Sequence, residues 1–258
     1  MNLHDLSPLT PELFGEPPVR EPVMTVVERW AQCVNLPAGH PEQLLEFLHR
    51  QMNEEANVME NSAASLVDFP DADWEIRMWL ARQCSDEARH TIVYKRLLEE
   101  RGGRVGQFPV MNFQYRIVRK IDSLLGRLAV QNRTFEADGL DAAVFAAEEA
   151  SRSGDHELAA VYDSQGADEV MHVAFANDWI RREVKKDPRK ILQIAHALTR
   201  GTEAFLQVSE GGGRNVSAYG VAHEERKLAG FNSEEIDTAH EITEARRASA
   251  RAQAASTA

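Results

Sequence analysis

Residues 86–90 read Asp-Glu-Ala-Arg-His, and residues 168–172 read Asp-Glu-Val-Met-His. The pentapeptide Asp-Glu-x-x-His therefore occurs twice, and the two copies lie 82 residues apart. A lone glutamate precedes each copy at nearly the same distance: Glu55 lies 32 residues before the glutamate of the first copy, and Glu136 lies 33 residues before that of the second. A doubled pattern of this length rarely arises by chance, so we interpret it as one functional arrangement that is present twice.

Glutamate and histidine side chains three positions apart project from the same face of a helix, so each Glu-x-x-His pair can hold one metal ion. A carboxylate from a neighbouring helix can then bridge two ions or complete one coordination shell. Four carboxylates and two imidazoles that project into a four-helix core are the ligand set of di-iron and di-manganese carboxylate proteins. The predicted metal ligands are Glu55, Glu87, His90, Glu136, Glu169 and His172.

Each predicted acidic ligand falls in the apolar stripe of an amphipathic helix. Leu80, Gln83, the first Glu-x-x-His pair and Tyr94, for example, follow one another in steps of three and four residues. A buried carboxylate without a partner is costly, so charges in such a stripe should be paired or bound to metal. The stripe around Glu136 is less regular, and we expect an irregularity of that helix at Gly139.

A third Glu-x-x-His pair, Glu46 with His49, has no counterpart 82 residues after its histidine, where the chain has Gln131. About one such pair is expected by chance in a glutamate-rich chain with nine histidines. We therefore interpret this pair as part of a solvent-exposed helix face.

The composition indicates a globular protein of the cytoplasm, with 258 residues, a net charge of −12 and two cysteines. The acidic charge argues against binding to nucleic acid, which needs basic patches. No apolar run approaches the ~18–20 residues of a membrane span, so we expect no membrane segment. Cys33 and Cys84 lack the spacing of a zinc site or a disulfide framework. Cys84 lies one turn before Glu87, either near the metal ions or as a buried, unreactive thiol.

The proline and glycine residues divide the chain into four predicted parts. These are an N-terminal arm with a short helix (1–40), a four-helix bundle (41–187), a C-terminal helical extension (188–247) and a disordered tail (248–258). The expected helices cover residues 23–36, 41–68, 71–101, 115–151, 155–187, 189–200 and 233–247. Residues 102–114 fit a long crossover better than a tight turn, since an extended segment of that length can return along a whole helix.

Residues 40–186 resemble the ferritin-like di-iron carboxylate superfamily, which includes ribonucleotide reductase small subunits, bacterial multicomponent monooxygenases, rubrerythrins and N-oxygenases. More narrowly, residues 69–72 (Phe-Pro-Asp-Ala), 86–90, 108–110 (Phe-Pro-Val) and 168–172 resemble a bacterial branch of ferritin-like proteins. The resemblance implies an all-α fold, namely a ferritin-like four-helix bundle with one long crossover. It also maps the metal ligands of the superfamily onto the six residues named above.

The resemblance implies roles for two aspartates that directly precede ligand glutamates. In similar superfamily members such aspartates pair with the metal-bound histidine of the opposite helix, which fixes the ring and raises its basicity. This assigns Asp86 to His172 and Asp168 to His90. The alternative is that both aspartates are surface acids.

Four further residues are candidates for redox or site-lining roles. Tyr94 stands seven residues after Glu87, a spacing that resembles that of the radical tyrosine in ribonucleotide reductase small subunits. The alternative is a core tyrosine that is hydrogen-bonded to a ligand. Gln165 stands where some N-oxygenases carry an additional metal-binding histidine, which weakens an assignment to amine oxidation. Cys84 and Tyr162 complete this group.

These features predict an O2-activating di-iron oxidoreductase, either a hydroxylase or oxygenase or an oxidase, that acts on a small organic molecule. Its cofactors would be two iron ions, or one manganese and one iron ion, with O2 as co-substrate. An external electron donor and a second copy of the chain in a homodimer are the expected protein partners. Two alternatives remain open. One is a non-catalytic protein that binds or stores iron or manganese, and the other is a tRNA-modifying di-iron hydroxylase, against which the acidic charge argues.

Overall fold

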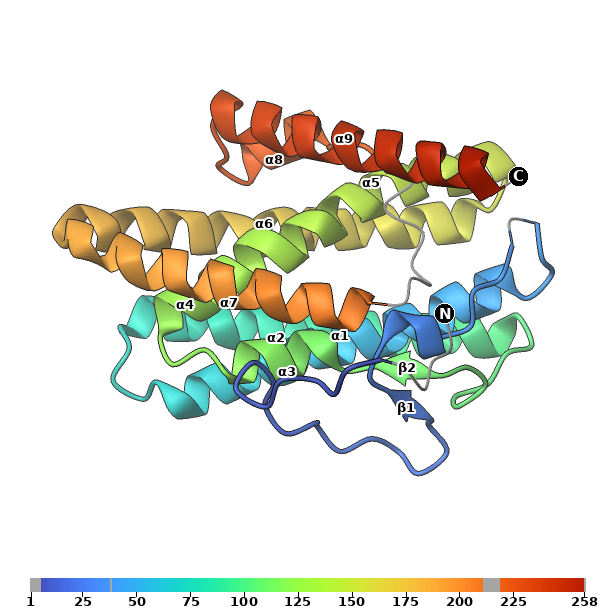
Figure 1. Cartoon of the computed structure of the whole chain (residues 1–258), viewed down its shortest axis with the longest axis horizontal. Helices are drawn as coiled ribbons and strands as arrows, with labels where there is room; N and C mark the ends of the chain where they lie inside the picture. Colours follow the sequence, from blue (N-terminus) through green and yellow to red (C-terminus); the bar gives the residue numbers. More distant parts are fainter. Residues whose placement is uncertain (1–5, 38, 211–218, 258) are drawn as a thin grey trace. The chain divides into compact units, whose positions relative to one another are not determined.

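The computed structural model describes residues 6–37, 39–210 and 219–257, and most of these residues are helical (Figure 1). The expectation of an all-α protein is therefore confirmed. The α-helices are α1 (Gln43–Asp68), α2 (Trp74–Glu100), α3 (Phe113–Arg119), α4 (Leu124–Val130), α5 (Ala137–Ser153), α6 (His156–Lys186), α7 (Ile191–Ser209), α8 (His223–Leu228) and α9 (Ser233–Thr257). Two-residue strands β1 (Val26–Val27) and β2 (Val110–Met111), 3-10 helices at Trp30–Gln32 and Pro188–Lys190, and a π-helix at Gln131–Glu136 complete the described elements.

The chain folds as two compact units. The first comprises the described residues within Met1–Gln131 and Asp187–Arg214, and the second those within Asn132–Lys186 and Asn215–Ala258. The first unit therefore contains α1 to α4 and α7, and the second contains α5, α6, α8 and α9.

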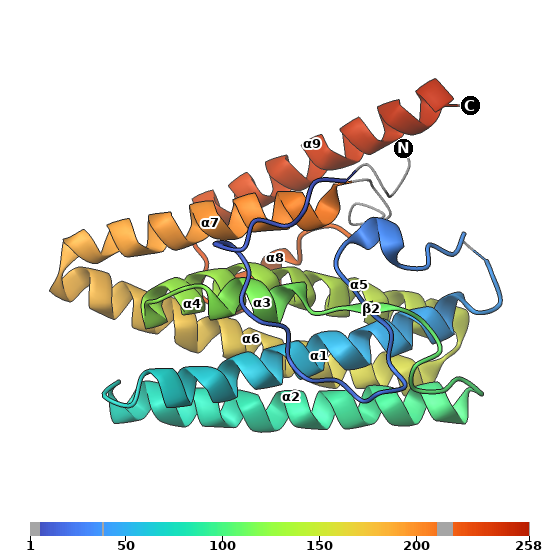
Figure 2. The ribbon, with the colours of Figure 1, turned by 60° about the horizontal axis from the view of Figure 1, so that its bottom comes forward.

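The helix pair α1 and α2 forms the main body of the first unit (Figure 2). Helix α1 ends at Asp68 because the following Phe69 precedes Pro70, and a residue before proline disfavours the helical conformation. Helix α2 ends at Glu100, and Gly102 adopts the left-handed conformation (φ +84°) that closes a helix C-terminus. Both ends agree closely with the boundaries expected from the sequence. Helix α7 packs against α3 and α4 in the same unit.

The N-terminal segment is less helical than expected. Instead of a helix over residues 23–36, the chain forms strand β1, which pairs in parallel with β2, and then the 3-10 helix Trp30–Gln32. Val26 and Val27 are β-branched and favour a strand. The side chain of Gln32 accepts hydrogen bonds from the backbone N–H groups of Glu28 (3.1 Å) and Arg29 (2.9 Å), which closes the chain into a short turn.

The prediction of a single helix over residues 115–151 is wrong. The structure has four elements there, namely α3, α4, a π-helix and α5. Ser123 starts α4 as an N-cap, since its hydroxyl accepts a hydrogen bond from the Gly126 N–H (3.1 Å). The irregularity expected at Gly139 lies instead at Gln131–Glu136, where the helix widens to the π form. Such π segments occur often at functional sites.

The second unit has its own apolar core between α5, α6, α8 and α9. Its buried members are Ala137, Leu140, Val173, Val221, Ala229, Phe231 and Ile236. A buried ion pair between Arg226 and Asp141 (2.7 Å) fixes α8 to α5. Two C-terminal helices are longer than expected, because α7 continues to Ser209 and α9 to Thr257. The residues after Arg247 are rich in alanine, the strongest helix former, which favours helix where we expected disorder.

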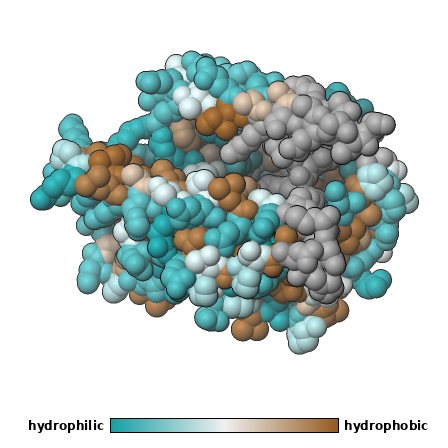
Figure 3. Space-filling view, in the orientation of Figure 1, coloured by the Kyte–Doolittle hydropathy of each residue, from teal (hydrophilic) through white to brown (hydrophobic). Residues whose placement is uncertain are grey.

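Within the described part of the chain, none of the helices combines the length and the apolar character that crossing a bilayer requires. Figure 3 shows that hydrophilic side chains cover most of the visible face and that apolar residues form separate patches. Exposed apolar side chains include Leu192 (70% exposed) near the start of α7.

Candidate metal centre

The first unit brings three of the predicted ligands together. Glu55 lies on α1, and Glu87 and His90 lie one turn apart on α2. The Nδ1 atom of His90 is 3.0 Å from Oε2 of Glu87 and 3.3 Å from Oε2 of Glu55. All three side chains are buried, and one potential ligand atom from each lies within 4.8 Å of the others. We call this group the first triad.

Electrostatics explain how three ionisable groups share this interior. Burial raises the pKa of Glu55, because it disfavours the charged carboxylate. Burial by itself lowers the pKa of His90, but the hydrogen bonds to Glu55 and Glu87 outweigh it and raise that pKa. A cation bound by the three groups would take the place of the shared protons, since metal ligands must be deprotonated.

The second unit holds a matching group, the second triad. Glu136 is the last residue of the π-helix, and Glu169 and His172 lie one turn apart on α6. The Nδ1 atom of His172 is 3.4 Å from Oε2 of Glu169 and 3.5 Å from Oε2 of Glu136. One potential ligand atom from each residue lies within 4.8 Å of the others, and all three side chains are buried. The amide of Asn132 donates to the backbone oxygen of His172 (3.2 Å), which ties the π-helix to α6.

Either triad can hold a metal ion. Each offers two carboxylates and one imidazole, a hard oxygen and nitrogen donor set that suits iron and manganese better than soft metals. Three side-chain donors also leave room in the coordination shell for further ligands. The donor sets therefore fit the cations that the sequence predicts.

A buried glutamine supports the glutamate of each Glu-x-x-His pair. Gln83 donates from Nε2 to Oε1 of Glu87 (3.5 Å), and Gln165 donates in the same way to Glu169 (3.3 Å). Gln165 was a candidate site-lining residue, whereas the role of Gln83 was missed. The signal was present, because both copies of the motif extend to Gln-x-x-Asp-Glu-x-x-His.

The two aspartates that precede the ligand glutamates are only partly buried. Asp86 forms ion pairs on its own helix with Arg82 (3.4 Å) and Arg89 (3.7 Å). The hydrogen bonds expected from the His172 ring N–H to Asp86 and from the His90 ring N–H to Asp168 stay predictions.

The other candidate residues differ in burial. Tyr94 is 1% exposed and lies one turn after His90, and Tyr162 is 4% exposed on α6. Cys84 is partly buried, and its pKa is raised first by burial and then by the charge of Glu87. A raised pKa keeps the thiol protonated and unreactive at neutral pH.

The interpretation of Glu46 and His49 as a solvent-exposed helix face is wrong. His49 is fully buried, and its Nε2 accepts a hydrogen bond from the Gly106 N–H (2.8 Å) while its ring meets Phe108 edge-on. The connection that follows α2 covers this face of α1. Burial lowers the pKa of His49 to about 4, so the imidazole is neutral and serves as a structural acceptor. Glu46 pairs with Arg50 (3.1 Å).

A second polar feature of α1 was also missed. Four buried polar side chains recur every four residues along one stripe, namely Asn53, Asn57, Asn61 and Ser65. Asn53 donates to the backbone oxygen of Met111 in β2 (2.8 Å), and Asn61 donates to Oε1 of Gln131 (2.7 Å). At 100° per residue this stripe begins on the side of α1 opposite Glu55, at Asn53 and Asn57. It therefore anchors β2 and the start of the π-helix to α1 and leaves the other side for the triad.

A comparison with protein-family models gives a match over residues 6–237, to a family described as proteins of unknown function, DUF455. The chain belongs to the DUF455 family. Searches of curated proteins and of solved structures gave no match. Both triads and both supporting glutamines lie within the matched residues.

Proposed function

We propose that this protein is an O2-activating di-iron oxidoreductase in which each triad holds one iron ion and the two ions form one dinuclear centre. The observation that carries the proposal is the repetition of the triad, with two carboxylates, one imidazole and one supporting glutamine in each unit. The resemblance to ferritin-like di-iron carboxylate proteins supports it, because these proteins use the same donor set. A manganese and iron pair would be held by the same atoms.

The burial of the ligand glutamates supports a metal-binding role for the triads over a purely structural role. Glu87 is 0% exposed and Glu169 is 3% exposed, and ionised carboxylates at such positions need a strong partner. One imidazole cannot neutralise two carboxylates in each triad, whereas a divalent cation can. Bound iron would supply the redox chemistry and the activation of O2.

The residues around the iron ions would set access and orientation. The amides of Gln83 and Gln165 hold Oε1 of the two α-helical glutamates, so that each glutamate turns Oε2 toward its histidine. This arrangement presents one defined oxygen from each carboxylate to a cation. Tyr94 in the first unit and Tyr162 in the second are both buried, so bulk water does not reach either side chain. The substrate would be a small organic molecule, and electrons would come from an external donor.

An iron titration in air tests this proposal against storage. Protein loaded with Fe(II) should consume O2 quickly and stop near two equivalents of iron per chain, unless a reductant is added. A storage protein would continue to oxidise and accumulate iron well beyond that ratio, which would contradict the proposal. A matched titration of His90→Ala, which lacks one imidazole, should show slower oxidation and a lower end point.

A further inference from the structure

An arginine of the π-helix connects the second triad to the C-terminal part of the chain. Arg133 lies on the π-helix three residues before Glu136. Its guanidinium donates from Nη1 to Oδ1 of Asn177 on α6 and from Nη2 to Oε1 of Glu235 on α9. These residues all belong to the second unit. The helical segment that carries a predicted metal ligand is therefore tied to α9 as well as to α6.

The residues that meet Arg133 form an ordered turn. Residues 229–235 join α8 to α9 and include the first turn of α9, and we call them the C-terminal anchor. Within it, the Asn232 N–H donates to Oε2 of Glu235 and the Glu235 N–H donates to Oδ1 of Asn232, both at 2.9 Å, which is a capping box. The ring centre of Phe231 lies 4.9 Å from the guanidinium carbon of Arg133. One carboxylate thus caps α9 and also pairs with the π-helix.

Asn177 joins the same anchor to α6. Its Nδ2 donates to the backbone oxygen of Ala229 (2.8 Å), while its Oδ1 accepts from Arg133. Arg181, one turn later on α6, forms an ion pair with Glu235 (3.6 Å). Because Asn177 is 0% exposed, loss of Arg133 would remove the donor from a buried amide oxygen, which is costly. Arg133, Asn177 and Glu235 therefore act as one connected group.

This group supports the π-helix at its most irregular point. Asn132 donates to the backbone oxygen of His172 (3.2 Å), and the next residue, Arg133, reaches Asn177. Two successive side chains thus hold the π-helix against α6. Successive residues of an α-helix are about 100° apart, and the wider π turn changes that angle. A return of this segment to the α form would therefore redirect Glu136.

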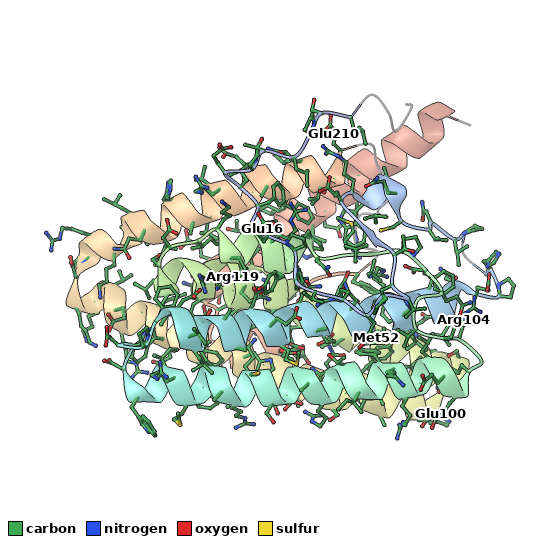
Figure 4. The ribbon with its side chains drawn as sticks, turned by 90° about the horizontal axis from the view of Figure 1, so that it is seen from below. Glu16, Met52, Glu100, Arg104, Arg119 and Glu210 are labelled. Atoms are coloured by element: carbon green, nitrogen blue, oxygen red, sulfur yellow. The ribbon has the colours of Figure 1, made fainter. Side chains whose placement is uncertain are left out.

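The lone glutamate of the first triad is held by a regular helix instead. Glu55 lies within α1, which continues for 26 residues, and Figure 4 labels Met52, one turn before it. The backbone hydrogen bonds of α1 set the direction of Glu55, whereas the direction of Glu136 depends on contacts made by the π-helix.

We infer that Arg133 is a positioning residue, which holds the π-helix against the C-terminal anchor and α6, keeps Glu136 directed toward His172 and so raises the iron affinity of the second triad. This inference rests on the proposed function, because it takes the second triad to bind iron. It gives the C-terminal anchor a role at the metal centre although the predicted ligands lie elsewhere in the chain. Because coupling is reciprocal, iron bound at the second triad should stabilise the anchor by the same factor.

Competition between the full chain and a chelator for Fe(II), without O2, tests the role of Arg133. Arg133→Met should keep one tightly bound ion and bind the second at least about 10-fold more weakly, since residues that orient metal ligands typically contribute about 10- to 100-fold to affinity. Arg133→Lys keeps the charge opposite Glu235 and should recover part of that loss. The control Arg127→Met removes an arginine with similar contacts, an ion pair with Asp68 (2.7 Å) and a ring contact with Phe69 (4.9 Å). It should lower the unfolding temperature and leave both iron affinities unchanged, and an equal loss of iron affinity there would overturn the inference.

A double-mutant cycle tests whether the anchor acts through Arg133. Glu235→Gln keeps an acceptor but removes the charge, so it should weaken binding of the second ion at least about 3-fold. In the Arg133→Met background the same change should have no further effect on iron affinity. Independent, additive losses would show that Glu235 does not act through Arg133 and would overturn the inference.

Hydrogen exchange supplies a readout that is independent of the chelator. The N–H groups of Gly230 and Phe231 donate to the backbone oxygens of Lys227 and Arg226 (2.9 and 3.0 Å). Loading with Fe(II) should slow their exchange about 10-fold in the wild type and should not slow it in Arg133→Met.

The outcomes separate this inference from the function on which it rests. If the wild type binds no iron, the proposed function and the role of Arg133 are both overturned. If Arg133→Met binds two ions as tightly as the wild type, or if iron leaves exchange in the anchor unchanged, only the role of Arg133 is overturned.

Discussion

The two triads have the same donors but are held by different backbones. In the first triad the lone glutamate, Glu55, lies on the regular helix α1, and His90 is within 3.3 Å of both carboxylates. In the second triad Glu136 ends a π-helix, and the corresponding distances from His172 are 3.4 and 3.5 Å. Gln83 and Gln165 donate the same hydrogen bond to the two triads. The comparison therefore shows that the ligand chemistry is repeated, whereas the backbone that supports the lone glutamate differs.

The largest expected effect follows from removal of either lone glutamate. If the triads are equivalent, Glu55→Ala and Glu136→Ala should each lower the iron content of the reconstituted protein from about two ions per chain to about one or fewer. Elemental analysis with a protein assay measures this ratio. The control Glu46→Ala, in the Glu-x-x-His pair that binds no metal in our account, should keep the full content. A full iron content in Glu136→Ala would remove the second triad from the assignment.

His49 lies in the Glu-x-x-His pair that has no second copy, so unlike His90 and His172 it should affect stability and not iron binding. Burial lowers the pKa of His49 to about 4 in the folded chain, against an ordinary value of 6.5, so the unfolded chain binds more protons between these pH values. The free energy of unfolding should therefore fall as the pH is lowered from about 6.5 toward 4, by up to about 3 kcal/mol.

Urea denaturation at a series of pH values measures this contribution. His49→Gln keeps an acceptor for the Gly106 N–H but does not titrate, so the wild type and the variant should converge in stability as the pH falls. Parallel stability profiles of the two proteins would show that His49 does not titrate with the expected pKa. The iron content of His49→Gln should equal that of the wild type.

The supporting glutamines test whether the two triads are alike beyond their ligands. Gln83→Leu and Gln165→Leu each remove the amide that holds a ligand glutamate, and each should weaken iron binding by about 10- to 100-fold. Competition with a chelator measures the affinity. Gln51→Leu, on α1 outside the triad, serves as the control. A loss at only one of the two positions would show that one metal site depends on its glutamine and the other does not.

The smallest effects are expected at the aspartates. Asp168→Asn keeps the shape of the side chain and removes its charge, so the variant should keep most of its iron at saturation but oxidise Fe(II) more slowly. Asp86→Asn should have a weaker effect, because Arg82 and Arg89 already share the Asp86 carboxylate. Stopped-flow absorbance measures the rates. If both variants oxidise Fe(II) at the wild-type rate, both aspartates are surface acids without a role at the metal centre.

The sequence was sufficient for those parts of the fold with strong local signals. Pro70 and Gly102 mark the helix ends around α1 and α2, and the apolar stripes place all six ligands inside helices. The break into α3, α4 and a π-helix was missed because the apolar stripe continues across it and only Ser123 signals a new start. The burial of His49 was missed because it depends on Gly106, 57 residues later in the chain.

Mössbauer spectroscopy of the full chain, reconstituted with iron-57 and exposed to O2, tests the central claim most directly. If the triads hold two ions of one dinuclear centre, the oxidised protein should contain two ferric ions that are antiferromagnetically coupled and have no ground-state spin. The matching sample should give no electron paramagnetic resonance signal from ferric iron. Two uncoupled high-spin ferric ions, or a single ion per chain at saturation, would contradict the account.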